Sequence, residues 1–183
     1  MKEFTHPGSG KKELVDLNQL IPSTVTVARN EWKYVAEVKT NLCPDLPELL
    51  CNPVEINQVL LNLIINASHA IAEKQESTGD REKGCIEITT VQDDDWIQLT
   101  VSDTGMGIPE PIRERIFEPF YTTKAVGQGS GQGLAIAHAV VSQGHGGSIS
   151  SAPRESGGTT FSIRLPLLTA AKPASDDPIA VKQ

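Results

Sequence analysis

The sequence lacks the features that mark secreted and membrane-spanning proteins. Only 4% of its 183 residues are aromatic, and no apolar run approaches the roughly 20 residues of a membrane span. The first residues, MKEFTHPGSGKKE, are polar and do not form a signal peptide. We therefore expect a cytoplasmic domain without direct membrane contact, and any membrane anchor of a full-length protein would have to lie outside this chain.

Cysteines are few, and acidic residues outnumber basic ones. Cys43, Cys51 and Cys85 are odd in number and lack metal-ligand spacing, which indicates unpaired thiols in a reducing compartment. The formal net charge of −7 argues against binding to nucleic acid or to an anionic membrane. A polyphosphate ligand would therefore need a metal ion and local N–H or lysine donors.

The overall composition is that of one soluble globular domain, with 38% hydrophobic and 21% charged residues. Residues 1–13 are polar and rich in glycine and lysine, as a linker is. Residues 14–168 form one compact unit without an internal repeat. Residues 169–183 are rich in alanine, proline and aspartate and predict a flexible tail.

Helical and strand patterns alternate along the compact unit. In chain order they predict a helix from Asp16 or Asn18 toward Asn30, a strand at 34–40, a long helix capped by Asn52, strands around 86–88 and 97–101, a short helix at 110–116, a helix at 134–143 that Gly144 ends, and a hairpin of 147–152 with 159–166. This order is typical of an α+β two-layer sandwich, in which helices cover one face of an antiparallel or mixed sheet.

A narrow polar band follows one side of the long helix. Its members, at spacings of three and four residues, are Glu55, Gln58, Asn62, Asn66 and His69. The amide oxygens of the two asparagines suit Mg²⁺, which keeps waters and takes few protein ligands beside phosphate oxygens. A self-satisfied polar network along a half-buried helix is the alternative, and His69 fits a phosphate contact and a plain exposed histidine about equally well.

The other three histidines show no metal-ligand spacing. His6 in the linker and His145 in a glycine-rich turn predict solvated side chains. His138 on the last helix predicts a position at the edge of the core.

The second strand of the central pair ends in DTGMGIP, at residues 103–109. Asp103, at the end of a rigid strand, could accept a hydrogen bond from an exocyclic amine. Gly105 and Gly107 would let a flat ring lie close to the backbone. The alternative is a strand-ending Asx turn, in which glycine supplies the dihedral angles that the turn needs.

The segment FEPFYTTKAVGQGSGQG combines aromatic residues with glycines. Its aromatic part predicts a clamp made by Phe117, Pro119, Phe120 and Tyr121. Gly133 opens a helix whose free N–H groups would suit phosphate, and Lys124 could reach a terminal phosphate. The spacing fits neither a Walker A loop nor a Rossmann turn. A disordered surface loop is the alternative.

Together these motifs resemble the ATP-binding catalytic domain of two-component sensor histidine kinases, within the gyrase, heat-shock chaperone, histidine kinase and MutL ATPase superfamily. QVLLNLIINASHAI resembles the N box, DTGMGIP the first glycine box, IFEPFYTTK the F box and GQGSGQGLAI the second glycine box. GGTTFSIRLPL matches the final hairpin of the family, and FEPFYTTK is most similar to kinases of the nitrogen-regulation type. The resemblance implies a Bergerat-type fold.

The resemblance also implies ATP and Mg²⁺ as cofactors. Asn66, helped by Asn62, would hold Mg²⁺ against the triphosphate, Asp103 would bind the adenine amino group, and residues 117–133 would form a mobile lid. The implied nucleotide contacts are Asn62, Asn66, His69, Asp103, Gly105, Gly107, Ile108, Phe117, Thr122, Thr123, Lys124, Gly129, Ser130, Gly131, Gln132, Gly133, Leu134 and Thr160. Gln132 departs from the family, which usually has an apolar residue there.

The residue at position 62 separates two kinds of activity. ATPases of the superfamily have a glutamate four residues before the Mg²⁺ asparagine, whereas this chain has Asn62, and an amide cannot serve as a general base. We therefore expect a protein histidine kinase domain that passes the γ-phosphate to a histidine on its own dimerisation and phosphoacceptor domain, with a response regulator downstream.

The acceptor histidine and its base are expected outside the chain, which would begin just after the dimerisation helices. The isolated chain should consequently bind Mg·ATP without phosphorylating itself. An ATP-driven clamp and a nucleotide-sensing pseudokinase are the alternatives, and Gln132 is the only hint of the latter.

Overall fold

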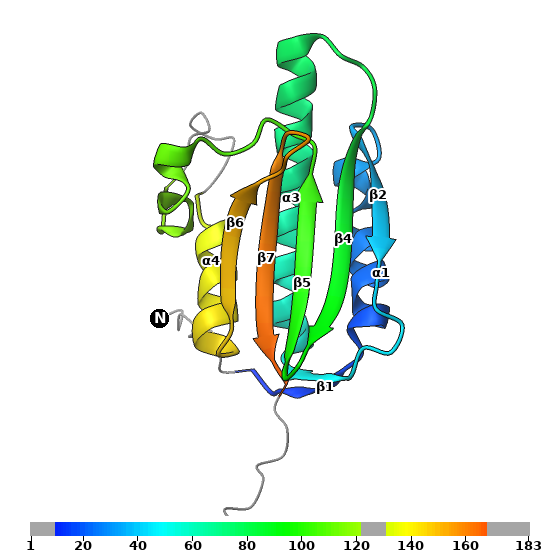
Figure 1. Ribbon diagram of the computed structural model, residues 1–183, viewed down its shortest axis with the longest axis vertical. Coiled ribbons are helices and arrows are strands. Elements are labelled where there is room, and N and C mark those ends of the chain that lie inside the picture. The colour runs from blue at the N-terminus through cyan, green and yellow to red at the C-terminus, as the bar shows by residue number, and fades with distance from the viewer. Residues whose placement is uncertain (1–9, 122–130, 168–183) are drawn as a thin grey trace, which may run out of the picture.

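A mixed β-sheet organises the chain, of which the computed structural model describes residues 10–121 and 131–167. Five strands pair in the order β2-β4-β5-β7-β6 (Figure 1). They are β2 (Ala36–Asn41), β4 (Gly84–Asp93), β5 (Trp96–Asp103), β6 (Ser148–Pro153) and β7 (Thr159–Pro166). β2 runs parallel to β4, and the other neighbours are antiparallel.

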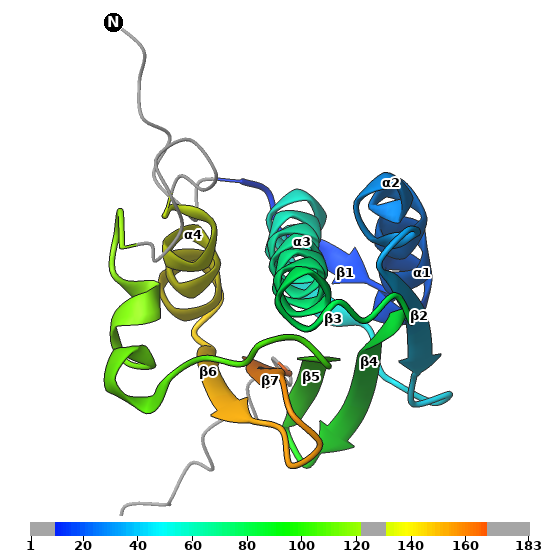
Figure 2. The same ribbon diagram turned by 90° about the horizontal axis from the view of Figure 1, so that it is seen from above.

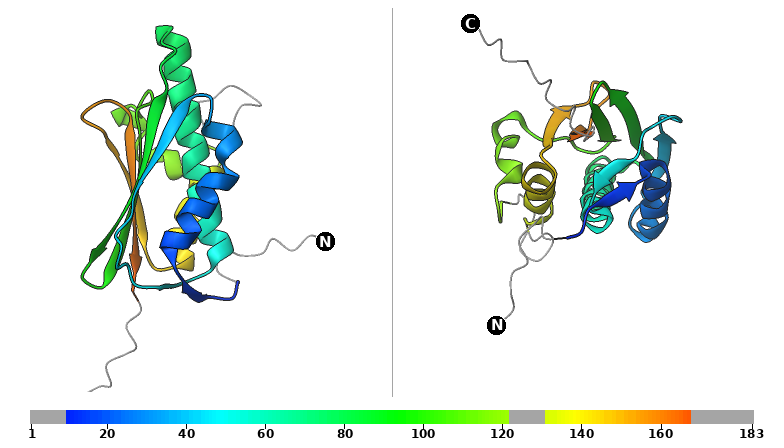
Figure 3. Two further views of the ribbon diagram at one scale, coloured as in Figure 1. Left: turned by 90° about the vertical axis from the view of Figure 1, so that its right-hand side faces the viewer. Right: turned by 90° about the horizontal axis from the view of Figure 1, so that it is seen from below.

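The helices all lie on one face of this sheet, side by side in the view from above (Figure 2). They are α1 (Leu17–Val27), the short α2 (Arg29–Trp32), the central α3 (Pro53–Thr78) and α4 (Gly133–Ala139), which continues as a π-helical turn, η3 (Val140–Gly144). The side view in Figure 3 shows the twisted sheet with its other face uncovered. The predicted α+β two-layer sandwich with a mixed sheet is confirmed.

Four short elements accompany the main sheet and its helices in the described part of the chain. β1 (Glu13–Val15) pairs antiparallel with β3 (Leu49–Cys51) in a separate two-stranded sheet. The short helix predicted at 110–116 is two 3₁₀ turns, η1 (Glu110–Ile112) and η2 (Arg115–Phe117). Within residues 10–121 and 131–167, no helix combines the length and the apolar character needed to cross a membrane.

Side-chain caps explain where the helices begin. Asp16 accepts a hydrogen bond from the amide of Asn18 at 2.8 Å, so the first of the two predicted start positions is correct. Asn52 accepts one from the amide of Val54 at 3.1 Å, and Pro53 occupies the first turn of α3. Gly79, with φ of 70°, ends α3 in a left-handed conformation.

Alternation along β5 decides which side chains face the helices. Ile97, Leu99 and Val101 are buried in the core beneath α3, whose inner face presents Leu60, Leu63, Ile64, Ala67 and Ile71. Asp103 continues the same alternation and is also buried. The end of β5 therefore places a carboxylate on the helix-facing side of the sheet.

The segment after α4 differs from the sequence prediction at two positions. The residue with positive φ is Gly146, at 64°, rather than Gly144. His145 is only 7% exposed, so the prediction of a solvated side chain is wrong. Its Nε2 accepts a hydrogen bond from the amide of Asn52 at 3.1 Å, and its Nδ1 is 2.9 Å from the Val140 carbonyl oxygen. The ring is buried because it joins the turn after α4 to the first turn of α3.

Candidate functional site

Asp103 is the one carboxylate of the candidate site that the fold buries, at 3% exposure. Its Oδ1 accepts hydrogen bonds from the amides of Gly105 at 2.8 Å and Thr159 at 3.4 Å. The first bond is an Asx turn, so that alternative is present in the structure. Burial raises the pKa of Asp103 above its ordinary value, against the lowering by these amides and by Arg154 and Lys74. In the described residues both bonds fall on Oδ1, which leaves Oδ2 as the acceptor for a ligand.

The glycines after Asp103 meet different requirements. A Cβ on Gly105 would lie 2.6 Å from the backbone carbonyl carbon of Ala70, so glycine is required for close packing against α3. The amide of Met106 donates to the carbonyl oxygen of Ala70 at 3.2 Å and fixes this contact. Gly107 has φ of 79°. That both glycines lie beside a bound ring stays a prediction.

The turn between β6 and β7 supplies two residues that the sequence analysis missed. Gly158 has φ of 101°, and a Cβ there would collide with the carbonyl oxygen of Asp103. Thr159 is buried and gives its amide to the Asp103 carboxylate. The sequence signal for them is the Gly-Gly pair between the two strands of the final hairpin.

Thr160, which was predicted to contact the nucleotide, lies on the other face of the sheet. Its hydroxyl oxygen is 2.8 Å from that of Ser102, whereas the neighbouring Thr159 faces Asp103. Because side chains alternate along a strand, an assignment that is wrong by one residue moves a side chain to the opposite face. Thr160 therefore lies on the face of the sheet opposite to Asp103, whereas Thr159 bonds to the Asp103 carboxylate through its amide.

One line of residues along α3 connects the parts of the site. Asn62, Asn66, Ala70 and Lys74 follow one another at intervals of four, and so lie along one side of the helix. Asn62 donates from Nδ2 to the carbonyl oxygen of Gly133 at 3.1 Å, at the beginning of α4. Ala70 and Lys74 contact the loop after β5. Asn66 lies between these attachments.

Asn66 differs from Asn62 in its partners. It is half-buried, and its side chain makes no hydrogen bond within the described residues. Asn62 is thus partly satisfied, through the bond of its Nδ2 to Gly133, whereas Asn66 is not satisfied by the described residues. Also within those residues, no three His, Cys, Asp or Glu side chains gather as a metal site. The amide oxygen of Asn66 is the kind of ligand that fits Mg²⁺ when phosphate and water complete the coordination. His69, one turn away, is half-buried.

The predicted aromatic clamp is wrong, because its members separate. Phe117 packs edge-on against Phe161, at 6.3 Å between ring centroids, and beside His138 at 5.7 Å. Phe120 is 73% exposed and has φ of 64°. Tyr121 stacks with the guanidinium of Arg115, 4.5 Å from its ring centroid. Phe117 belongs to the edge of the core, while Phe120 faces solvent.

The remaining predicted contacts lie around the start of α4, in the loop after β5, or outside the described residues. Gly131 has φ of 65° and accepts a hydrogen bond from the amide of Phe120 at 3.1 Å. Gln132 is exposed and precedes α4, whereas Leu134 and Ile108 are half-buried against the core. Five predicted residues lie outside the described ranges: Thr122, Thr123, Lys124, Gly129 and Ser130.

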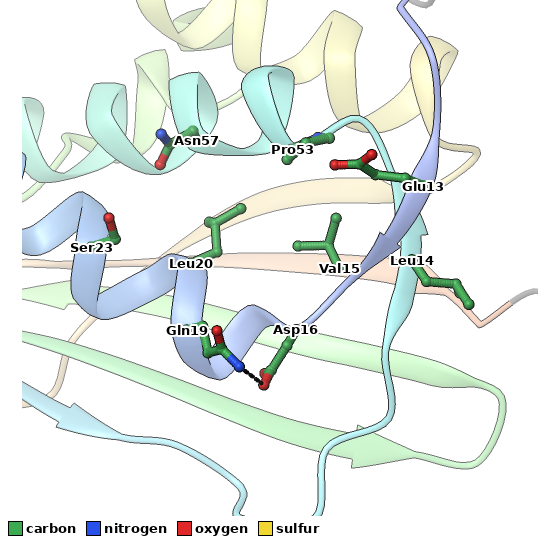
Figure 4. Close-up of a pocket in the computed structure, with 9 residues that line it drawn as sticks. All are labelled: Glu13, Leu14, Val15, Asp16, Gln19, Leu20, Ser23, Pro53 and Asn57. Atoms are coloured by element: carbon green, nitrogen blue, oxygen red, sulfur yellow. Dashed lines mark hydrogen bonds between the residues drawn. The ribbon is translucent and has the colours of Figure 1, made fainter.

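A surface hollow of about 340 Å³ lies away from Asp103, between β1, α1 and the first turns of α3 (Figure 4). Its lining includes the carboxylates of Glu13 and Asp16 and the side chains of Leu20 and Asn57. None of its lining residues is a predicted nucleotide contact. The hollow is therefore separate from the candidate site.

The sandwich, its glycine turns and its asparagine-bearing helix are those of an ATPase domain class. The chain belongs to the family described as histidine kinase-, DNA gyrase B- and HSP90-like ATPases, which matches residues 51–169. The resemblance drawn from the four motifs is confirmed.

The chain is similar in sequence to named sensor proteins. It is 34% identical over 166 residues to the sensor histidine kinase ZraS of Escherichia coli K12, covering 90% of this chain and 33% of that protein. It is 41% identical over 168 residues to the C4-dicarboxylate transport sensor protein DctB of Rhizobium meliloti, covering 90% of this chain and 25% of that protein. The chain thus spans a third or less of these two relatives.

Solved structures agree with this placement. The nucleotide-free catalytic domain of the histidine kinase ThkA has a TM-score of 0.71 at 30% identity, covering 85% of this chain and 95% of that one. Full-length ShkA in complex with AMPPNP has a TM-score of 0.71 at 27% identity, covering 89% of this chain and 32% of that one. The chain is thus an ATPase domain that resembles the catalytic domains of histidine kinases in sequence and in fold.

Proposed function

We propose that the chain binds Mg·ATP beside Asp103 and Asn66 and donates the γ-phosphate to a histidine of its own dimerisation and phosphoacceptor domain. The observation that carries this proposal is the buried Asp103 carboxylate, oriented by two backbone amides that both bond to Oδ1. Because ATP is a cytoplasmic substrate, this activity belongs in the cytoplasm.

Asp103 recognises the base through hydrogen-bond complementarity. With Oδ1 held by Gly105 and Thr159, Oδ2 can accept a hydrogen bond from the exocyclic amine of adenine. A carbonyl oxygen at the same position of the base, as in guanine, would face the carboxylate without a proton between them. Because a buried carboxylate left without a hydrogen-bond donor is costly, the site should bind adenine much more tightly than guanine.

Asn66 provides the amide oxygen for Mg²⁺, whose charge would offset that of the triphosphate. The order of contacts along α3 supports this assignment. Ala70, one turn after Asn66, packs against the loop that begins at Asp103, and Asn62, one turn before, holds the start of α4. A nucleotide with its base at Asp103 therefore has its phosphates directed along α3 toward Asn66.

Phosphoryl transfer is favoured over hydrolysis because no base is present at position 62. The amide of Asn62 is not a proton acceptor, and its Nδ2 is already bonded to Gly133. In the transfer, the bond from the γ-phosphorus to the bridging oxygen breaks and ADP leaves. A bond forms to the imidazole nitrogen that carries the lone pair, and the proton on the other ring nitrogen passes to an acidic side chain beside it on the acceptor domain. The chain's own residues hold and orient the nucleotide.

A response regulator is the proposed downstream partner. ThkA has been solved in complex with the response regulator protein TrrA, and that ThkA structure has a TM-score of 0.66 to this chain at 28% identity, covering 85% of this chain and 41% of that one. The structural similarity supports the proposal that this chain also acts together with a response regulator.

The proposal is tested by mixing the chain with the matching helical domain and ATP labelled at the γ-phosphate. We expect an acid-labile phosphate on a histidine of the helical domain and none on the chain alone. Mg·ATP binding without transfer would instead identify a nucleotide-sensing module. Rapid hydrolysis by the chain alone would identify an ATP-driven clamp, and either result would overturn the proposal.

A further inference from the structure

Lys74 lies on α3 where three segments of the site meet. Its Nζ donates a hydrogen bond to the carbonyl oxygen of Thr104 at 2.9 Å. The position that a Cβ on Gly157 would occupy is 3.9 Å from the same nitrogen. Thr104 follows Asp103 in the loop after β5, and Gly157 belongs to the turn between β6 and β7. Lys74 thus bonds to one of the two segments that contribute amides to the Asp103 carboxylate and lies near the other.

The Thr104 contact is one of several hydrogen bonds between the loop and α3. Another is one turn earlier, where the amide of Met106 donates to the carbonyl oxygen of Ala70 at 3.2 Å. The Thr104 hydroxyl in turn accepts a hydrogen bond from the amide of Cys85 at 2.9 Å, on β4. The loop backbone after Asp103 is therefore held from the helix on one side and from the sheet on the other.

Two cations act on Asp103, and they differ in their own partners. Arg154, at the end of β6, is paired with Glu87 at 3.3 Å, so part of its charge is compensated by a neighbouring carboxylate. Lys74, on α3, forms none of the ion pairs seen among the described residues. Burial raises the pKa of Asp103, and the amides of Gly105 and Thr159 together with these two cations oppose that rise.

We propose that Lys74 is a positioning residue of the nucleotide site, which fixes the Thr104 backbone against α3 and keeps Asp103 in the carboxylate form. The second part rests on the proposed function, because an ionised Asp103 matters only if an exocyclic amine binds there. A neutral Asp103 carries a proton that competes for the oxygen the amine needs. The uncompensated charge of Lys74 opposes that protonation from the helix side.

The direct test is the titration of the Asp103 carboxyl carbon, followed by NMR in the nucleotide-free chain. Lys74→Met removes both the charge and the donor, whereas Lys74→Gln removes the charge and keeps a donor. We expect the Asp103 midpoint to move to higher pH in both variants and to stay near the wild-type value in Lys74→Arg. Lys83→Met is the matched control, because Lys83 is exposed and outside this cluster. An unchanged midpoint in Lys74→Met and Lys74→Gln would overturn the proposal.

A second readout is the affinity for ATP as a function of pH. Loss of one hydrogen bond to a charged group predicts about tenfold weaker binding in Lys74→Met at neutral pH. The acid side of the binding profile should also move to higher pH. A loss of equal size at every pH would indicate a structural role and overturn the electrostatic part. If the wild-type chain bound no ATP, the proposed function would fail, whereas the carboxyl titration would still decide the role of Lys74.

Discussion

The side-chain amide of Asn62 donates a hydrogen bond of 3.1 Å to the carbonyl oxygen of Gly133, the first residue of α4. This bond joins the middle of α3 to the helix that follows the glycine-rich segment. A glutamate or aspartate at position 62 could not donate it. The amide of Asn62 therefore has a structural role. The same amide also means that position 62 carries no general base.

Asn62→Asp should remove this attachment while keeping the size of the side chain. We expect the free energy of unfolding to fall by about 1 kcal/mol, the usual contribution of one hydrogen bond. Amide exchange at Ile136, which bonds to the carbonyl oxygen of Gln132, should also become faster. Chemical denaturation and hydrogen exchange measure the two effects. Gln58→Ala, on the exposed side of α3, is the control, and equal behaviour of the two variants would refute the role of the bond.

Asn66→Ala should separate ligand binding from stability. Because its side chain makes no hydrogen bond in the described residues, we expect a change in unfolding free energy within about 0.5 kcal/mol. ATP affinity in Mg²⁺ should fall about tenfold, because one ligand of the metal is lost. Without Mg²⁺, the variant and the wild-type chain should bind ATP equally. Calorimetric titrations with and without Mg²⁺ measure the two affinities. An equal loss of ATP affinity under both conditions would contradict the assignment of Asn66 to the metal.

Asp103→Asn should bind ATP at least about tenfold more weakly without losing stability at neutral pH. Burial raises the pKa of Asp103 from 3.8, so the folded state holds its proton more tightly than the unfolded state does. The stability this group contributes is complete below pH 3.8 and is lost as pH rises through the raised folded pKa.

The asparagine side chain keeps an oxygen for the amides of Gly105 and Thr159 and cannot ionise. We therefore expect thermal melts at neutral pH to show the variant as stable as the wild-type chain or more so. The difference should shrink toward acid pH. A variant that melted lower at neutral pH would show that the carboxylate stabilises the fold, contrary to this account.

Gly158→Ala and Gly157→Ala form a matched pair in the turn between β6 and β7. Both glycines have positive φ, which costs an alanine roughly 1–2 kcal/mol. Only at position 158 would the added Cβ collide with the backbone of Asp103. We expect the Gly158→Ala variant to lose ATP binding and much of its stability. The Gly157→Ala variant should still bind ATP, and its stability should fall by no more than the cost of the positive φ. Equal effects would show that backbone conformation alone matters.

The repeating features of the fold were predictable because each depends on residues close in sequence. The cap at Asn52, the alternation of Ile97, Leu99 and Val101, and the opening of α4 at Gly133 all agree with the structure. Local pattern and capping chemistry decide these features.

Features that depend on distant contacts could not be predicted in the same way. His145 is buried because it meets Asn52, far away in sequence, and nothing beside it in the chain indicates this. Thr159 and Thr160 are chemically alike, and only the register of β7 with β5 decides which of them faces Asp103. Lys74 was overlooked because its partner Thr104 lies in another segment.

A crystal structure of the chain with Mg²⁺ and a non-hydrolysable ATP analogue tests the central claim most directly. The account expects the adenine amine at about 3 Å from Oδ2 of Asp103 and the metal on the amide oxygen of Asn66. A nucleotide bound elsewhere, for example in the hollow between β1 and α1, with Asp103 free of any ligand, would contradict it.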